Sequence, residues 1–195
     1  NEVFSIKCQG NFSEFKTNLL YKEIGGNTLF VSANTHTKDV SSGEWTQEEI
    51  VAKCFQENGK CDYEGTLWGA AAIYEVDGKT SEFAPYLRAL ASSNEKYFPS
   101  AFLFYVLEET GGTDDEYNKI LSSAQKRPND EWFWEMPNSP HGEFYDTSLA
   151  ILALGGKDES HVETHVLPWL ESTQDADGCW KGGEIRDTAF ILYSS

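Results

Sequence analysis

The chain has 195 residues, of which 39% are hydrophobic and 14% aromatic, which is enough apolar material to build the core of a folded domain. Asp and Glu number 32 against 15 Lys and Arg, giving a formal net charge of −17. Because such a surface repels phosphate groups, we expect no nucleic-acid partner. Because no stretch approaches the roughly 18 apolar residues of a membrane span, we expect no membrane insertion.

Residues 1–44 are predicted to be a β-rich N-terminal segment, or the end of a preceding β domain. β-forming residues cluster at 4–6 and 28–33, and the intervening Gly25-Gly26-Asn27 is typical of a turn. The chain begins at Asn1 without a signal-like segment, so we expect it to be a processed or excised piece of a longer protein.

Residues 45–195 show a helical and repetitive pattern. Four nearly all-apolar runs each begin with Ser or Thr, at 66–74, 100–107, 147–154 and 188–193. Glycines follow the first three runs and predict helix ends at 78, 111–112 and 155–156. Amphipathic segments between the runs, such as 82–91 and 163–170, predict an outer layer around apolar inner helices. We expect the leading hydroxyl of each run to cap free helix amides.

A second marker, an aromatic or aliphatic pair, recurs before each apolar run. The pairs are Val51-Ala52, Tyr86-Leu87, Ile120-Leu121 and Trp169-Leu170, so the last interval is the longest. Such regular spacing indicates a repeat architecture in which each helical hairpin buries its apolar face only against its neighbours.

The last of these copies continues from Trp169-Leu170 to Gln174, Gly178 and Trp180, and it resembles the QW motif of the squalene-cyclase and prenyltransferase repeat family. The earlier copies are decayed; the third keeps Ile120-Leu121, Gln125 and Trp132. The resemblance implies a mainly α fold: a partial α/α toroid of about four helical hairpins over residues 45–195, with a short N-terminal β segment. It also implies that the Gln and Trp side chains are structural.

The catalytic motifs of that family are not matched. The run Glu184–Ala189 is similar to the Asp-x-Asp-Asp-Thr-Ala motif of class II terpene cyclases, but Arg186 stands where the protonating acid belongs. A guanidinium group is always charged and cannot protonate an alkene. Asp177 and Cys179 imitate part of the zinc site of protein prenyltransferases, but no His follows them. We therefore expect no cofactor.

The longest interval between repeats carries an inserted loop that is rich in aromatic and acidic residues. Long loops on rigid scaffolds often bind ligands, and aromatic rings beside carboxylates suit carbohydrate. The candidate ligand-binding residues are Trp132, Trp134, Glu143 and Tyr145. An acid–base site would use His141, Glu143, Tyr145 and Asp146. The alternative is that Trp132 is the decayed QW tryptophan and that its neighbours pack against it.

His161 and His165 lie one helical turn apart and are able to share a metal ion, although the glutamate of a metalloprotease motif is missing. The alternative is a pair of solvated surface histidines, and we favour no metal site.

The four cysteines fit two disulfides with three possible connectivities among Cys8, Cys54, Cys61 and Cys179. Cys54 and Cys61 flank a glycine-containing hinge and are able to pair locally. Asn11 begins an N-glycosylation sequon. These features predict an extracellular or cell-surface protein.

The sequence therefore favours a non-catalytic, prenyltransferase-like α/α-toroid domain of a secreted or cell-surface protein. Its role would be structural, or to bind a protein or glycan ligand. One alternative is a carbohydrate-active lyase or hydrolase that uses the acid–base residues of the inserted loop. The other is a fragment of a larger enzyme of the terpene-cyclase or prenyltransferase kind.

Overall fold

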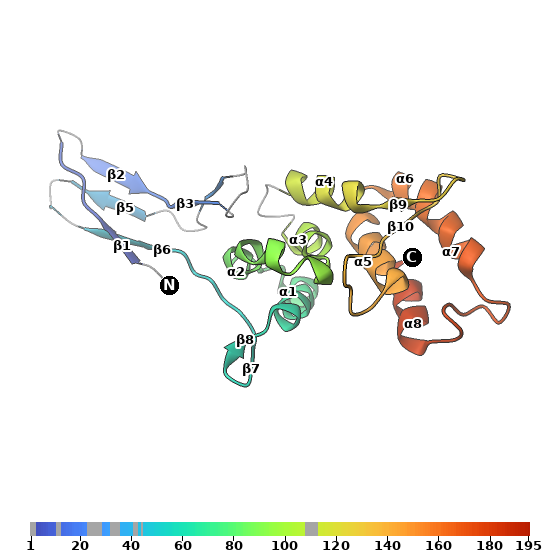
Figure 1. The fold of residues 1–195 in the computed structure, drawn as a ribbon. Coiled ribbons are helices and arrows are strands. Elements are labelled where there is room, and N and C mark those ends of the chain that lie inside the picture. Colours follow the sequence, from blue (N-terminus) through green and yellow to red (C-terminus); the bar gives the residue numbers. More distant parts are fainter. Residues whose placement is uncertain are drawn as a thin grey trace.

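A computed structural model describes residues 3–10, 13–22, 29–31, 36–40, 43, 45–107 and 113–195. The protein is mainly helical with a few short strands, as the sequence predicts (Figure 1). The glycosylation sequon at Asn11, the turn at 25–27 and the glycines at 111–112 lie outside the described residues.

The strands at the N-terminal end form small antiparallel pairs. β1 (Val3–Ile6) pairs with β6 (Thr46–Glu49), and β2 (Glu14–Thr17) pairs with β5 (His36–Asp39). A third pair joins β3 (Leu20–Tyr21) to β4 (Phe30–Val31). β6 lies beyond residue 44, where the sequence pattern placed the end of the β-rich segment.

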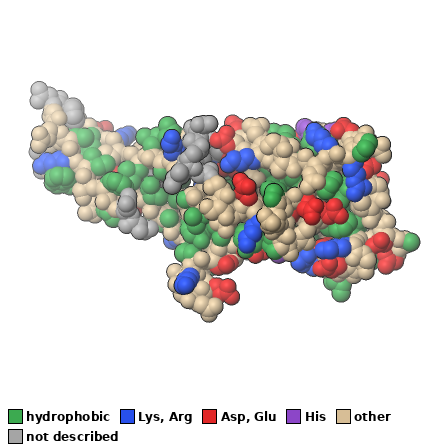
Figure 2. Space-filling view, in the orientation of Figure 1, with side chains coloured by type: hydrophobic (Ala, Val, Ile, Leu, Met, Phe, Trp, Pro, Cys, Tyr) green, Lys and Arg blue, Asp and Glu red, His purple; other side chains and the backbone are tan. Residues whose placement is uncertain are grey.

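The buried carboxylate of Glu48 connects three of these strands. Its Oε1 accepts a hydrogen bond from the Thr17 hydroxyl of β2 and lies 2.8 Å from Nδ1 of His36 in β5. Few apolar side chains are buried here. Among the described residues of the strands before β6, Phe15 is the buried hydrophobic side chain. Figure 2 shows hydrophobic side chains on the surface of this end. The main core lies among the helices.

Residues 50–62 link the strands to the first helix and contain no helix. The pair Val51-Ala52 lies in a stretch without regular secondary structure, in which the Lys53 N–H donates to the Glu82 carbonyl at 2.9 Å. β6 ends at residue 49 and β7 (Gln56–Glu57) follows, so strands occupy both sides of this pair. β7 pairs with β8 (Lys60–Cys61) in a hairpin.

A disulfide joins Cys54 to Cys61 across that hairpin, which confirms the local pairing. The second expected disulfide is wrong, because Cys8 and Cys179 are free thiols. Cys8 follows β1 and Cys179 precedes the last helix, and Figure 1 shows these two elements at opposite ends of the molecule.

Four apolar helices form the centre of the helical part. They are α1 (Tyr63–Asp77), α3 (Pro99–Val106), α5 (Glu143–Leu154) and α8 (Ile185–Ser194). They coincide with the four apolar runs and pack in chain order, with α3 against α1 and α5, and α8 against α5. Gly78 ends α1 in the left-handed conformation at φ 68°, as predicted.

A second set of helices follows the apolar ones along the chain. α2 (Ala84–Ala89) packs on α1 and α3, and α4 (Asp114–Ser123) packs on α3. α6 (Glu159–His161) and the π-helical turn η4 (Val162–Val166) lead into α7 (Leu167–Thr173). Shorter elements lie between helices along the chain: η1 (Ala91–Ser93), η2 (Glu95–Tyr97), β9 (Gln125–Lys126) and β10 (Trp132–Phe133). Within the described residues, no helix is long and apolar enough to cross a membrane.

The threonines of the apolar runs do not cap their helices. Thr66, Thr147 and Thr188 lie a turn inside α1, α5 and α8, because each of these helices begins earlier than its apolar run. Instead, each hydroxyl accepts a hydrogen bond from the backbone N–H of a preceding aromatic residue: Phe55 at 3.0 Å, Trp134 at 2.9 Å and Trp180 at 3.2 Å, respectively. Because the same hydrogen bond occurs in all three helices, Thr66, Thr147 and Thr188 can be aligned as equivalent positions, and we call this alignment the common register.

This register changes the alignment of the repeats. The indole N–H of Trp180 donates to the Leu170 carbonyl at 2.9 Å, and that of Trp134 donates to the Ile120 carbonyl at 2.8 Å. Trp134, rather than Trp132, is therefore the counterpart of Trp180. Gln174 donates to the Gly178 carbonyl at 2.9 Å and closes its loop.

An aromatic cluster fills the space between the four apolar helices. The ring of Trp68 in α1 lies 4.9 Å from Phe102 of α3, 6.2 Å from Tyr145 of α5 and 5.7 Å from Phe190 of α8, between centroids. Its indole N–H donates to the Tyr145 hydroxyl at 2.8 Å. One side chain of the first helix thus contacts each of the other three.

Candidate functional site

A group of polar side chains lies beside the aromatic cluster. Glu64, Tyr145 and Arg186 each lie two residues before the aligned threonine, so they occupy equivalent positions on α1, α5 and α8. His141 lies among them, with Nε2 2.7 Å from Glu64 Oε1 and its ring 4.1 Å from that of Tyr145. We call Glu64, His141, Tyr145 and Arg186 the inner-helix cluster.

Both ring nitrogens of His141 have partners. Nδ1 lies 3.4 Å from Arg186 Nη1. Since a guanidinium only donates, this contact makes Nδ1 the acceptor and leaves the Nε2–H to donate to Glu64. These partners therefore favour the tautomer with the proton on Nε2, in which both ring nitrogens have a contact.

Arg186 is itself held by acidic neighbours. Its Nη2 lies 2.7 Å from the buried Asp187, which also contacts Lys181 Nζ at 2.9 Å. The hydrogen bond with Asp187 raises the pKa of Arg186 above its usual value. Burial raises the pKa of Tyr145 to about 12, so this phenol stays protonated at neutral pH and is not a ready base.

Asp146 contacts the loop that carries His141 into the inner-helix cluster. Its carboxylate accepts hydrogen bonds from the Met136 N–H at 2.8 Å and from the Ser139 hydroxyl at 3.1 Å. The Ser139 oxygen in turn accepts the N–H groups of His141 and Gly142, both at 3.2 Å. Burial raises the pKa of Asp146 to about 6. This aspartate therefore fixes the loop that carries His141.

Glu143 lies in a different electrostatic environment. Burial, together with the charge of Glu135, raises the pKa of its carboxyl group, while Arg127 and Lys181 oppose the change. Of the four candidate acid–base residues, the structure brings together the rings of His141 and Tyr145. Asp146 contacts the loop backbone, and Glu143 has other charged neighbours.

The two candidate ligand-binding tryptophans have structural partners. Trp134 is fully buried. Trp132 is 7% exposed, stacks on His165 with ring centroids 4.4 Å apart, and has Lys126 Nζ 3.7 Å from its ring centroid. Its indole N–H donates to Asp130 at 2.9 Å. Neither tryptophan presents an open face of the kind that stacks on a sugar.

His161 and His165 pair with carboxylates. His161 Nδ1 lies 2.6 Å from Asp158, and His165 Nδ1 lies 3.2 Å from Asp130. Over the described ranges, no group of three or more His, Cys, Asp or Glu side chains is arranged to hold a metal ion. Both rings also contact Trp132, and the two imidazole rings lie 5.7 Å apart between centroids.

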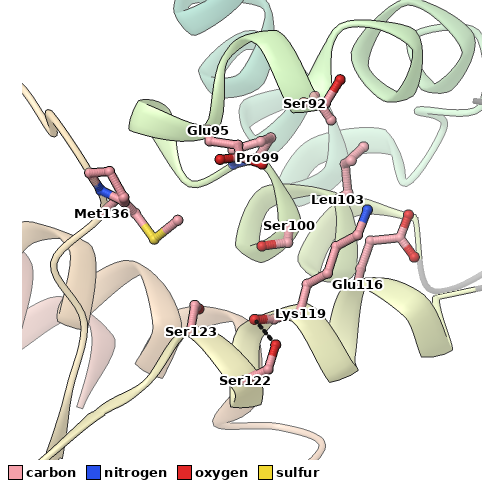
Figure 3. Close-up of a pocket in the computed structure, with 12 residues that line it drawn as sticks. Ser92, Glu95, Pro99, Ser100, Leu103, Glu116, Lys119, Ser122, Ser123 and Met136 are labelled. Carbon is pink, nitrogen blue, oxygen red and sulfur yellow. Dashed lines mark hydrogen bonds between the residues drawn. The ribbon is translucent and has the colours of Figure 1, made fainter. Parts of the chain in front are cut away.

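A pocket of about 320 Å³ opens between α3, α4 and the loop before α5 (Figure 3). Its polar wall comprises Glu95, Glu116, Lys119 and four serines, Ser92, Ser100, Ser122 and Ser123. Its apolar lining includes Leu103 of α3 and Met136 of the loop, and Figure 3 shows these two on opposite sides of the pocket. Ser122 and Ser123 donate to backbone carbonyls of α4, which leaves their oxygens able to accept.

A buried ion pair supports one wall of this pocket. Glu116 and Arg88 are each 4% exposed, and Arg88 Nε lies 3.3 Å from Glu116 Oε1. Burial raises the pKa of the Tyr21 phenol of β3, and the charge of Arg88 and its hydrogen bond to this phenol partly oppose that change. The pair thus connects α4, α2 and the N-terminal strands.

None of the four candidate ligand-binding residues lines the pocket. The inserted loop does contribute to it, through Met136 and Pro137. The length of that loop was the feature of the sequence that indicated a ligand site in this region. The serines come from three separate segments, and no local motif marks them.

No protein-family model matches the chain, and no curated protein is similar to it. The resemblance to the QW family therefore depends on the residues quoted above, and the internal register is an independent observation.

Proposed function

We propose that residues 45–195 are a non-catalytic α/α-toroid repeat domain of the prenyltransferase-like kind, and that the protein binds a small ligand or a partner outside the cell or at its surface. The recurring threonine–aromatic hydrogen bond supports the repeat, as does the chain-order packing of the apolar helices. The Cys54–Cys61 disulfide supports an oxidising compartment.

The main support for a non-catalytic domain is that both ring nitrogens of His141 already have side-chain partners. A general base needs a free nitrogen within reach of a substrate proton. Both His141 nitrogens contact charged side chains, and the adjacent space between the helices is occupied by Trp68. These contacts support a structural ion pair in place of an open reaction site.

The pocket between α3 and α4 supports a ligand-binding role. Its volume of about 320 Å³ lies at the lower end of the range of small-molecule sites, roughly 300–1,000 Å³. Hydroxyl groups, two carboxylates and the Lys119 ammonium group line the pocket together with apolar side chains on opposite sides, so the ligand that fits best carries several hydroxyl groups and apolar surface between them. A single sugar unit has this chemistry, and a glycan is one of the two ligand classes, protein or glycan, that the sequence left open.

Calorimetric titration with a panel of monosaccharides tests the ligand. Ser123→Leu fills the pocket from α4, and Ser160→Leu is the matched control on an exposed serine outside the pocket. We expect binding by the wild type and by the control, with at least tenfold weaker binding by Ser123→Leu. Equal binding by both variants, or none by the wild type, would contradict the proposal.

A double-mutant cycle on Glu64 and His141 tests the non-catalytic assignment without a substrate. If the pair is structural, His141→Ala lowers the free energy of unfolding, and the coupling to Glu64→Gln is about 0.5–1 kcal/mol for partly exposed groups. Catalytic residues are commonly replaced with no loss of stability, or with a gain. A stability-neutral His141→Ala would therefore count against the assignment.

The second candidate is a carbohydrate-active enzyme, and the Glu64–His141 contact beside Tyr145 is the observation that favours it. A glycan-depolymerising activity that His141→Ala abolishes would establish this candidate. Activity that survives Glu143→Gln would place the chemistry at the inner-helix cluster.

A further inference from the structure

The tip of the β7–β8 hairpin carries the only Asn-Gly pair of the sequence, Asn58-Gly59. These two residues form the loop between Glu57 and Lys60, which face each other across the two strands. Both have positive φ, 52° for Asn58 and 78° for Gly59, as a type I′ turn requires. Figure 1 shows the hairpin projecting from the body of the molecule. The turn therefore favours this dipeptide and places it in solvent.

The main-chain nitrogen of Gly59 is open to reaction. Within the described residues, neither its N–H nor the Asn58 side chain has a hydrogen-bond partner. Both residues are exposed, and no other part of the chain comes within 4 Å of the place where a Cβ of Gly59 would lie. The nitrogen is therefore able to approach the side-chain amide carbon of Asn58 without breaking a hydrogen bond and without hindrance from a side chain.

We propose that Asn58 is a site of spontaneous deamidation, and that the free Gly59 nitrogen makes it one. This nitrogen attacks Cγ of Asn58, the bond from Cγ to Nδ2 breaks, and ammonia leaves with the proton of the former Gly59 N–H. Water then opens the succinimide ring, at Cγ to give aspartate or at the main-chain carbonyl carbon to give isoaspartate. The sum converts an amide and water into a carboxylate and ammonium, so no enzyme or oxidant is needed.

The chemical change is confined to the tip of the hairpin. The product adds one negative charge to a chain whose formal net charge is −17, and isoaspartate also lengthens the main chain by one carbon. The base of the hairpin is held separately, because the Cys54–Cys61 disulfide closes it and the Phe55 N–H donates to the Thr66 hydroxyl at 3.0 Å. We therefore expect the helical domain to keep its fold as the modified form accumulates.

Asn129 provides a comparison within the same molecule. It is exposed, like Asn58, and lies in the connection between β9 and β10. The next residue, Asp130, has a φ of 61°, but its N–H donates to the Arg127 carbonyl at 3.0 Å. A nitrogen that is already hydrogen-bonded loses that bond when it attacks, which raises the barrier. We therefore expect Asn129 to react more slowly, even with glycine after it.

Peptide mapping by mass spectrometry during incubation of the folded, unreduced protein in mildly alkaline buffer tests the proposal. Deamidation raises the mass of a peptide by about 1 Da. We expect this gain at Asn58, and none at position 58 in Asn58→Gln over the same time. Asp130→Gly is the matched control, because it creates a second exposed Asn-Gly pair at a positive φ. In this variant we expect Asn58 to react at least tenfold faster than Asn129.

Two results would overturn the proposal. One is that Asn58 gains no mass while a synthetic peptide of residues 55–60 deamidates to completion, because the folded turn would then protect the pair. The other is an equal rate at Asn58 and Asn129 in Asp130→Gly, because the dipeptide alone, and not the free nitrogen, would then set the rate. Neither result depends on saccharide binding, so failure here is distinguishable from failure of the proposed function.

Discussion

The buried hydroxyl of Thr147 allows the common register to be tested by one substitution. Thr147 is fully buried, accepts the Trp134 N–H at 2.9 Å and lies 3.3 Å from the Trp134 carbonyl. Thr147→Val keeps the volume but leaves a buried N–H without an acceptor, at a cost of about 1–3 kcal/mol. The lost bond to the carbonyl adds about 1 kcal/mol. We therefore expect the free energy of unfolding to fall by about 3 kcal/mol.

Urea denaturation of matched variants measures this loss. Thr147→Ser keeps the hydroxyl and removes one methyl group, so it should lose only about 1 kcal/mol. Thr66→Val and Thr188→Val should also destabilise, and Thr188→Val least, because Thr188 is partly exposed. If Thr147→Val costs no more than Thr147→Ser, the hydrogen bond does not support the helix and the register argument fails.

Three further predictions concern the site and its surroundings. Because folding raises the pKa of Asp146 to about 6, its contribution to stability is present below about pH 4 and is lost as the pH rises through 6; a carboxyl NMR titration with a midpoint near 4 would refute this. Trp68→Ala removes the ring that joins four helices and should cost about 3 kcal/mol, whereas Trp45→Ala, at a 60% exposed position, should cost under 1 kcal/mol in the same melts. Thiol titration of the unfolded, unreduced protein should find two reactive groups, Cys8 and Cys179, and a count of zero would indicate a second disulfide.

The apolar helices could be predicted because their signals are local. Each run is long, nearly all apolar and, in the case of α1, closed by a glycine whose conformation requires it. The caps could not be predicted, because the threonine hydroxyls bind amides that lie 8 to 13 residues earlier in the chain. Helix-capping rules consider only amides two or three residues after the hydroxyl, so they do not predict these longer-range hydrogen bonds.

Spacing aligns Trp132 with Trp180, whereas the hydrogen bonds align Trp134 with it. Trp132 and Trp134 are two residues apart, and either is close to the offset of the QW motif. Only the partners of the indole N–H groups separate them, since Trp134 reaches the Ile120 carbonyl and Trp132 reaches Asp130. The pairing of β1 with β6 is likewise non-local, which is why the strands extend past the predicted boundary.

The candidate site was predicted in part. The inserted loop was identified from its length, and it carries His141 into the inner-helix cluster and Met136 into the pocket. The other members of both groups come from distant segments, such as Glu64 on α1 and Glu116 on α4. Their approach depends on how the helices pack, so no motif in the sequence identifies them.

Met136 offers the most direct measurement, because it is the only methionine of the chain and lines the pocket. Methyl-labelled methionine gives one NMR signal, which can be followed with the His141 ring signals during a monosaccharide titration. A binding domain with a structural His141 predicts that the Met136 signal shifts saturably and that the His141 signals stay unchanged. A shift at His141 with none at Met136 would place the ligand at the inner-helix cluster and contradict the account.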